Sequence, residues 1–137
     1  FISAFGEHVI VNEVEEAMQE ALTKYTDVEV REFTVVPQVN PKEGLPYHEW
    51  FVEFVTAPED IHLFSKAIDE ALRKRNGYYK DLINGKVLRQ LQITSLKKDA
   101  FHLFMKSQGK LGGQNKIARL SNNRTIANHF TFDESSS

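Results

Sequence analysis

The strongest constraint on the fold is a stretch near the N-terminus in which apolar residues recur at helical spacing. These residues are Val11, Val14, Ala17, Met18, Ala21, Leu22 and Tyr25. Asn12, with Glu15 three residues later, matches a capping box, in which each side chain bonds the other residue's backbone amide. The stretch therefore predicts an amphipathic helix from Asn12 to Tyr25, which must bury its apolar face against another element.

The chain then changes to the spacing of a strand. Residues 28–36 alternate at first and are rich in β-branched side chains, so they predict a strand that Pro37 ends. A loop with prolines and a glycine follows over 37–46. Residues 49–54 alternate again, with Trp50 on one face and Phe51 on the other. These two runs predict a hairpin with a long connection.

Helical and strand spacing continue to alternate in the rest of the chain. We predict a second helix that starts at 56–59, runs through Arg75 and is stopped by Gly77, then a short helical turn over 78–84 and a strand over 87–96. A third helix is opened by Asp99 and stopped by Gly109. Counting residues 1–8 as a first strand, this order resembles a ferredoxin-like βαββαβ layout with an added C-terminal helix. The predicted class is α+β, with helices covering one face of a small, mostly antiparallel sheet.

Length and composition indicate one compact domain. The 137 residues suffice for a real core, and the absence of cysteine excludes disulfides and thiolate metal sites and fits the cytoplasm. No apolar run approaches the ~20 residues that span a bilayer, and the first residues lack the features of a signal peptide. Because the chain begins with Phe1, we expect a piece cut from a longer protein. We expect residues 133–137 to form a disordered tail.

Charge is divided unevenly along the chain. Residues 1–71 carry 4 basic and 15 acidic side chains, whereas residues 72–137 carry 13 basic and 4 acidic ones. This division favours an anionic ligand near the C-terminal half, although solvated surfaces show such divisions too.

A glycine-rich basic stretch, Gly109 to Arg119, lies in that C-terminal half. Three glycines in five positions predict a flexible arm, and Lys116 and Arg119 follow it with fixed charges. Such an arm can carry an ammonium into a site built by another body, or it can be a solvated loop. It lacks the Gly-Lys-Ser/Thr ending of a phosphate-binding P-loop.

Other polar residues favour structural roles. No pair of histidines has metal-ligand spacing, so we predict no metal site and structural or solvent-exposed roles for His48, His62, His102 and His129. His8, in a turn after Gly6 and Glu7, is kept as a functional candidate.

Three charged runs on the predicted helices also have a structural interpretation. Glu15-Glu16 and Asp69-Glu70 are predicted to be outward-facing helical charges. The cations at 73–75, followed by tyrosines at 78 and 79, could stack on single-stranded nucleic acid, but cations at a helix C-terminus are favoured by its macrodipole in any case.

The sequence Gly-Lys-Leu-Gly-Gly-Gln-Asn-Lys-Ile-Ala-Arg-Leu-Ser-Asn-Asn-Arg, residues 109–124, resembles the C-terminal signature of the auxin-responsive, Gretchen Hagen-type acyl acid amido synthetases in their bacterial form. Residues 46–54 and 72–79 resemble further parts of that family. Residues 3–17 are similar to the hinge-proximal loop and helix of the wider adenylate-forming superfamily. The resemblance covers nearly the whole chain, but only the C-terminal domain of the family.

The resemblance implies a lid domain. In the family, a large N-terminal domain holds ATP with Mg²⁺ and a small carboxylic acid, and the acyl group passes through an adenylate to an amino acid. The positions that match the nucleotide or acyl-adenylate site are Gly112, Gly113, Gln114, Lys116 and Arg119, with Lys116 as the catalytic group. Ala118 departs from the proline common in the family.

In the second step of the family reaction the lid rotates, and the resemblance brings Gly6, Glu7 and His8 toward the acyl carbonyl. The implied partners are the N-terminal domain and the two small substrates, with no nucleic acid and no membrane. The alternative function is a non-catalytic, ferredoxin-like module that binds a small ligand or RNA.

Overall fold

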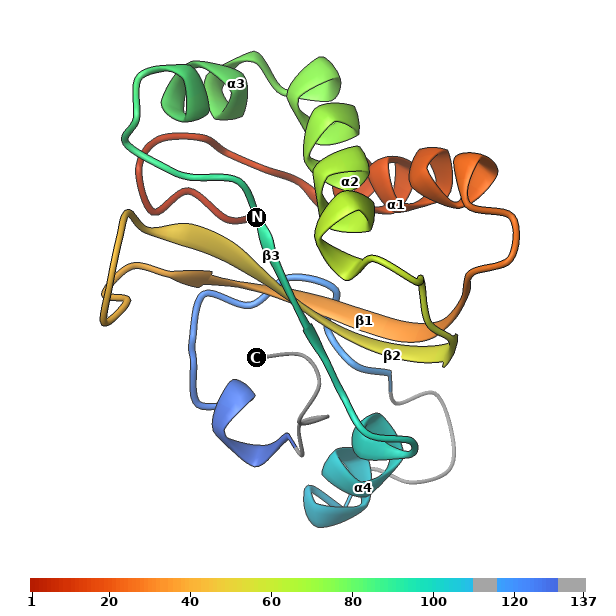
Figure 1. The fold of residues 1–137 in the computed structure, drawn as a ribbon. Helices are drawn as coiled ribbons and strands as arrows, with labels where there is room; N and C mark the ends of the chain where they lie inside the picture. Colours follow the sequence, from red (N-terminus) through yellow and green to blue (C-terminus); the bar gives the residue numbers. More distant parts are fainter. Residues whose placement is uncertain (110–115, 131–137) are drawn as a thin grey trace.

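The computed structural model describes residues 1–109 and 116–130. The elements in these residues are α1 (Val11–Lys24), β1 (Glu29–Gln38), β2 (Tyr47–Thr56), α2 (Ile61–Arg75), α3 (Gly77–Asn84), β3 (Gln92–Ser95), α4 (Ala100–Ser107) and the 3-10 turn η1 (Ala127–His129). The strands form one sheet in the order β1-β2-β3 (Figure 1). β1 and β2 pair antiparallel over most of their lengths, and β3 adds a short parallel pairing to β2. The predicted α+β class is confirmed.

Helices lie on both faces of the sheet rather than on one. α1, α2 and α3 lie above it in Figure 1, while α4 and η1 lie below. The cause is β2, which is apolar on both sides: Trp50 and Val52 join the core under α1 and α2, and Phe51 joins a second core under α4 and η1. A strand buried on both faces needs a layer on each.

The first predicted strand is reduced to a single bridge between Ile2 and Val9. Both side chains are fully buried in the core under α1 and α2, so the apolar start of the chain packs as predicted but does not join the sheet. In the described part of the chain the sheet thus lacks the first strand of a ferredoxin-like βαββαβ layout.

Pro37 does not end β1, which continues to Gln38. The amide of Val35 points away from β2 and donates to the Arg119 carbonyl at 2.9 Å. Residues two apart on a strand point the same way, so the ring nitrogen of Pro37 also faces outward and costs no bond with β2.

The predicted strand over 87–96 forms only at Gln92–Ser95. The amides of Val87 and Leu88 donate to the Leu82 carbonyl, and the Arg89 amide donates to the Pro46 carbonyl. Residues 87–89 therefore belong to the connection between α3 and β3. Gly77 was predicted to stop a helix and instead begins α3. Asn76 separates α2 from α3. Its backbone is extended and so ends α2, and its side-chain oxygen accepts a hydrogen bond from the Tyr79 amide at 2.8 Å, which caps α3.

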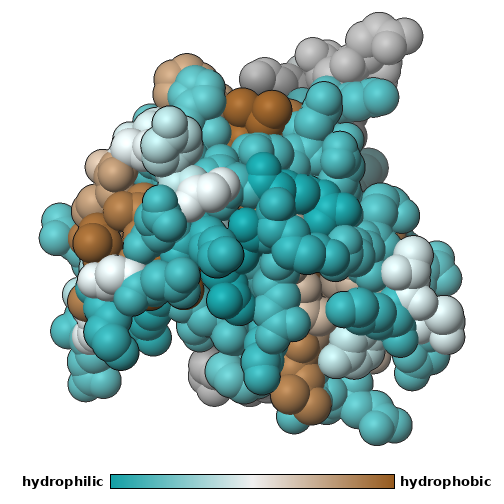
Figure 2. Space-filling model, turned by 90° about the horizontal axis from the view of Figure 1, so that it is seen from above, coloured by the Kyte–Doolittle hydropathy of each residue, from teal (hydrophilic) through white to brown (hydrophobic). Residues whose placement is uncertain are grey.

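α4 begins after Asp99 and has Gly109, with a φ of 66°, just past its end, as predicted. The buried carboxylate of Glu53 accepts the amides of Asp99 at 2.8 Å and Phe101 at 3.3 Å, so β2 supplies the cap for this helix. Viewed from the side of α1 to α3, the surface is mostly hydrophilic with small hydrophobic clusters (Figure 2). In the described ranges no helix is long and apolar enough to cross a membrane.

Candidate functional site

The backbone that follows Lys116 is fastened to the outer edge of β1. The Arg119 carbonyl accepts the Val35 amide at 2.9 Å, and the Ser121 amide donates to the Val35 carbonyl at 3.0 Å. The Thr34 hydroxyl donates to the Ala118 carbonyl at 2.6 Å. Lys116 therefore stands two residues before a segment that the sheet holds in a fixed position.

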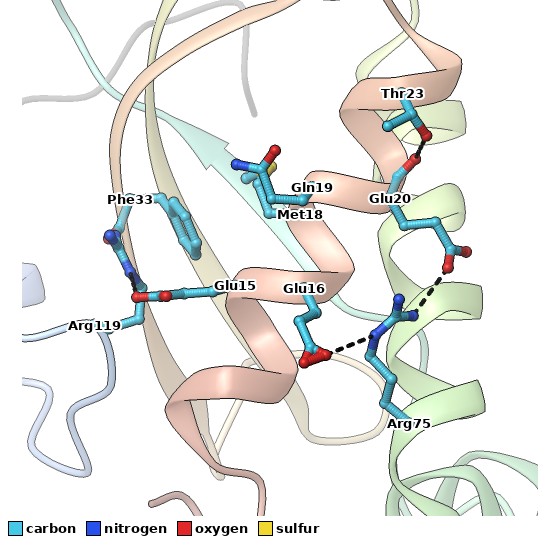
Figure 3. A pocket seen from close by; sticks show the side chains of 9 residues that line it. All are labelled: Glu15, Glu16, Met18, Gln19, Glu20, Thr23, Phe33, Arg75 and Arg119. Carbon is cyan, nitrogen blue, oxygen red and sulfur yellow. Dashed lines mark hydrogen bonds and ion pairs between the residues drawn. The ribbon is translucent and has the colours of Figure 1, made fainter.

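Arg119 is turned onto its own domain. Its guanidinium lies over the Phe33 ring at 3.9 Å, pairs with Glu32 at 2.6 Å and Glu15 at 3.5 Å, and donates to the Phe33 carbonyl (Figure 3). Half-buried charge pairs and a cation–π contact hold this conformation. In this arrangement Arg119 anchors the basic segment, and its contact with a nucleotide stays a prediction.

Lys116 itself is exposed and makes no hydrogen bond or ion pair with another described residue. Its neighbour Ile117 packs against the core under α4 and η1. An ammonium on an anchored backbone is available to an anion outside this domain. Gly112, Gly113 and Gln114 lie outside the described residues. The flexibility predicted for that loop therefore stays a prediction.

An open groove of about 650 Å³ runs over α1 between Arg119 and Arg75 (Figure 3). Its charges are paired with each other: Arg75 contacts Glu20 at 3.0 Å and Glu16 at 3.8 Å. The hydrogen bond from Lys74, helped by Arg75, holds the pKa of Glu20 below its usual value. The groove therefore presents satisfied ion pairs and no activated acid or base.

The second candidate loop, Gly6 to His8, has a fully buried carboxylate. Glu7 accepts the Phe5 amide at 2.7 Å and contacts His48 Nε2 at 2.7 Å. Burial opposes ionisation, but the hydrogen bonds from His48 and Phe5 outweigh it, so the pKa of Glu7 lies below its usual value. Gly6 and His8 are exposed, and the His8 ring stacks on Phe1 at a centroid distance of 4.2 Å.

The segment that follows Lys116 runs along the edge of β1 and reaches both faces of the sheet. Ile117 packs against the core under α4, whereas Leu120 packs against the core under α1 and α2, which also holds Ile2 and Val9. Asn122 donates to the Phe1 carbonyl at 2.9 Å, so the segment passes close to the start of the chain. Among the described residues, the pockets that Arg119 and His8 line are different ones.

The structural or solvent-exposed positions predicted for the other four histidines are confirmed, and the absence of a metal site stays a prediction. His48 is buried in a structural pair, and His62, His102 and His129 are exposed. Within the described residues no group of three or more histidines and carboxylates could hold a metal ion.

The prediction that Asp69 faces outward is wrong. Asp69 is buried and accepts the Tyr79 hydroxyl at 2.5 Å, the Leu91 amide at 3.1 Å and Arg73 at 2.9 Å. Asp69 lies beside the apolar stripe of α2, one position after the buried Ile68. This position on the helix could have predicted that Asp69 is buried.

The cations at the end of α2 form ion pairs within the domain. Arg73 binds Asp69, and both Lys74 and Arg75 bind Glu20. Tyr79 is fully buried. The ion pairs agree with the structural interpretation of the basic run. The buried Tyr79 ring is not available for a nucleic-acid base to stack on.

The fold and these segments define a small α+β domain with an exposed lysine just before the segment on the edge of β1 and an anchored loop near the N-terminus. Residues 12–125 match the GH3 family C-terminal domain. The match covers most of the chain, so the chain belongs to the GH3 family.

Solved structures share the fold. AtGH3.15 acyl acid amido synthetase in complex with 2,4-DB superposes with a TM-score of 0.66 at 15% identity, covering 91% of this chain and 25% of that one. A second GH3.15 acyl acid amido synthetase gives 0.66 at 18% identity, covering 91% and 24%. The chain thus spans about a quarter of the length of these synthetases. No curated protein matches it.

Proposed function

We propose that this chain is the mobile C-terminal lid of an ATP-dependent acyl acid amido synthetase. The observation that carries the proposal is Lys116, an exposed ammonium that pairs with no other described residue and precedes a segment anchored to β1, in a chain of the GH3 family. The lid would close on an N-terminal domain of the same protein that holds ATP and a small carboxylic acid. We further propose a cytoplasmic location, with no nucleic acid or membrane as partner.

Lys116 would act in the first half-reaction. A carboxylate oxygen attacks the α-phosphorus of ATP, pyrophosphate leaves, and an acyl-adenylate forms. Both reactants are anions, so an ammonium placed between them lowers the electrostatic cost of the transition state. The anchored backbone favours this role because less conformational freedom is lost when the side chain reaches its target.

The Gly6–His8 loop would act in the second half-reaction. The amine nitrogen of an amino acid attacks the acyl carbon, AMP leaves, and the ammonium proton is lost to solvent or a base. Under this proposal the lid rotates between the two steps, so that it presents Lys116 to the site in the first and the Gly6–His8 loop in the second.

Mg²⁺ would accompany ATP on the other domain. The carboxylates described here are spread over ion pairs and caps rather than gathered in a cluster, and Lys116 fits a phosphate or carboxylate instead. The alternative, a ligand- or RNA-binding module, loses its main support because the basic run of α2 forms ion pairs within the domain.

The test is an assay of the full-length protein with ATP and a panel of carboxylic acids, beginning with 2,4-DB. Acid-dependent release of pyrophosphate, followed by AMP and an amide when amino acids are added, supports the proposal. Release of ADP and phosphate, or no acid-dependent turnover with any acid of the panel, contradicts it.

The 137-residue chain alone is expected to fold cooperatively but to form no amide. It has two cores of its own, yet under this proposal the atoms that bind ATP and the acid belong to another domain. Thermal unfolding followed by circular dichroism tests the first part, and product analysis with ATP, acid and amino acid tests the second. Amide formed by the isolated chain would show that the site is complete within it.

A further inference from the structure

The Gly6–His8 loop has a backbone shape that its own residues do not favour. Gly6 has a φ of 89° and His8 a φ of 46°. Glycine adopts such values at little cost. Histidine adopts them more often than most other residues, but the conformation still costs free energy, which surrounding contacts must offset. Those contacts should therefore be visible around the loop.

Glu7 supplies the first set of contacts. Its side chain is fully buried, and its two oxygens bond the Phe5 amide within the loop and His48 Nε2 on β2, both at 2.7 Å. The other ring nitrogen of His48 has no partner in the part of the chain described, so Glu7 is the group that orients this ring. A carboxylate held in this way cannot reach a substrate outside the domain.

Asn76, between α2 and α3, supplies the second set. Its amide nitrogen donates to the carbonyls of Glu7 at 3.0 Å and His8 at 3.3 Å, and also to the Glu13 carboxylate at 3.1 Å. Its amide oxygen caps α3. The loop is thus fastened from β2 by one side chain and from the helices by another, while the Gly6 backbone and the His8 ring remain exposed.

We infer that Glu7 and Asn76 are positioning residues that hold the exposed Gly6–His8 backbone in the shape the amide-forming half-reaction uses. This inference rests on the proposed function. It replaces direct contact of the Glu7 side chain with the acyl carbonyl by an internal anchor, and it leaves the first half-reaction to Lys116.

The experiment measures both half-reactions in the full-length protein. Pyrophosphate release reports adenylation, and a chase of the preformed acyl-adenylate with amino acid reports amide formation. Glu7→Leu is expected to slow the chase by about tenfold to a hundredfold, as misplacement of a reacting geometry by about 1 Å does, with adenylation changed less than about twofold. Glu7→Gln, which keeps a hydrogen-bonding group of the same shape, should recover most of the rate.

Two further variants separate positioning from stability. Asn76→Ser keeps an N-cap for α3 but cannot reach both loop carbonyls, so it should slow the chase selectively in a protein that folds, and hydrogen exchange at the His8 amide should accelerate in the 137-residue chain. Glu53→Leu removes another buried carboxylate, which accepts two backbone amides at α4 and lies 3.6 Å from Arg31. It should lower the unfolding midpoint without slowing the chase.

Equal losses in both half-reactions for Glu7→Leu and Asn76→Ser, or a slow chase in Glu53→Leu, would overturn the inference while leaving a working ligase. Unchanged exchange at His8 in Asn76→Ser would overturn it without any activity measurement. If the parent protein forms no acyl-adenylate, the proposed function itself has failed, which is a different result.

Discussion

Lys116→Ala in the full-length protein is expected to slow acyl-adenylate formation by roughly two to three orders of magnitude. This corresponds to about 3–4 kcal/mol, the usual cost of removing one preorganised charge donor from a transition state. Amide formation from a preformed acyl-adenylate should fall much less, because under this proposal the lid has then rotated and presents the Gly6–His8 loop in place of the lysine. Separate measurement of pyrophosphate release and of the amino acid chase decides between these outcomes.

Lys106→Ala provides the matched control for this prediction. Lys106 is an exposed lysine in the last turn of α4, on the same side of the sheet as Ile117, and its loss removes the same charge. Adenylation should stay within about twofold of the parent, as for most surface substitutions. If both variants slow adenylation equally, the basic character of this face matters rather than Lys116. If Lys116→Ala unfolds the protein, the residue is structural.

Local periodicity was sufficient to predict most elements of this fold. α1, α2 and both long strands follow from apolar spacing, and their boundaries lie close to the predicted ones. The errors lie where tertiary contacts override a local signal. Pro37 remains in β1 because its nitrogen faces outward. β3 is short because the amides of residues 87–89 bond α3 and the β1–β2 loop, and that of Leu91 bonds Asp69 on α2, instead of the sheet.

The part of the candidate site that could be predicted from the sequence is the part that lies within a recognisable motif. Lys116 was found from its resemblance to a family signature, and its exposure agrees with a role outside the domain. The anchor of that segment joins Thr34 to Ala118, 84 positions apart, and the pair of Glu7 with His48 spans 41 positions. No periodic pattern reports contacts over such separations. Both were missed because Thr34, Glu7 and His48 are ordinary polar residues when taken singly, and Ala118 takes part only through its backbone carbonyl.

Asp69 is the clearest case of a residue whose importance is visible only in the structure. Its carboxylate is buried and joins three elements: the Tyr79 hydroxyl of α3, the Leu91 amide before β3 and Arg73 on its own helix. Burial, and then the negative charge of Asp69, raise the pKa of Tyr79 well above its usual value, so the hydroxyl keeps its proton and donates it. Asp69 therefore holds α2, α3 and the start of β3 together.

Asp69→Ala is expected to destabilise the chain by about 3–5 kcal/mol, because it leaves a buried hydroxyl, a buried amide and a half-buried guanidinium without their acceptor. In a chain of this size a loss of about 3 kcal/mol lowers the unfolding midpoint by roughly 10 °C. Glu70→Ala, at the next position, removes an exposed carboxylate from the same helix and should change stability by less than about 0.5 kcal/mol. Thermal and urea unfolding of the two variants measure the difference. Equal, small effects would mean that water replaces the Asp69 contacts, and that the junction of α2, α3 and β3 is held by its apolar side chains instead.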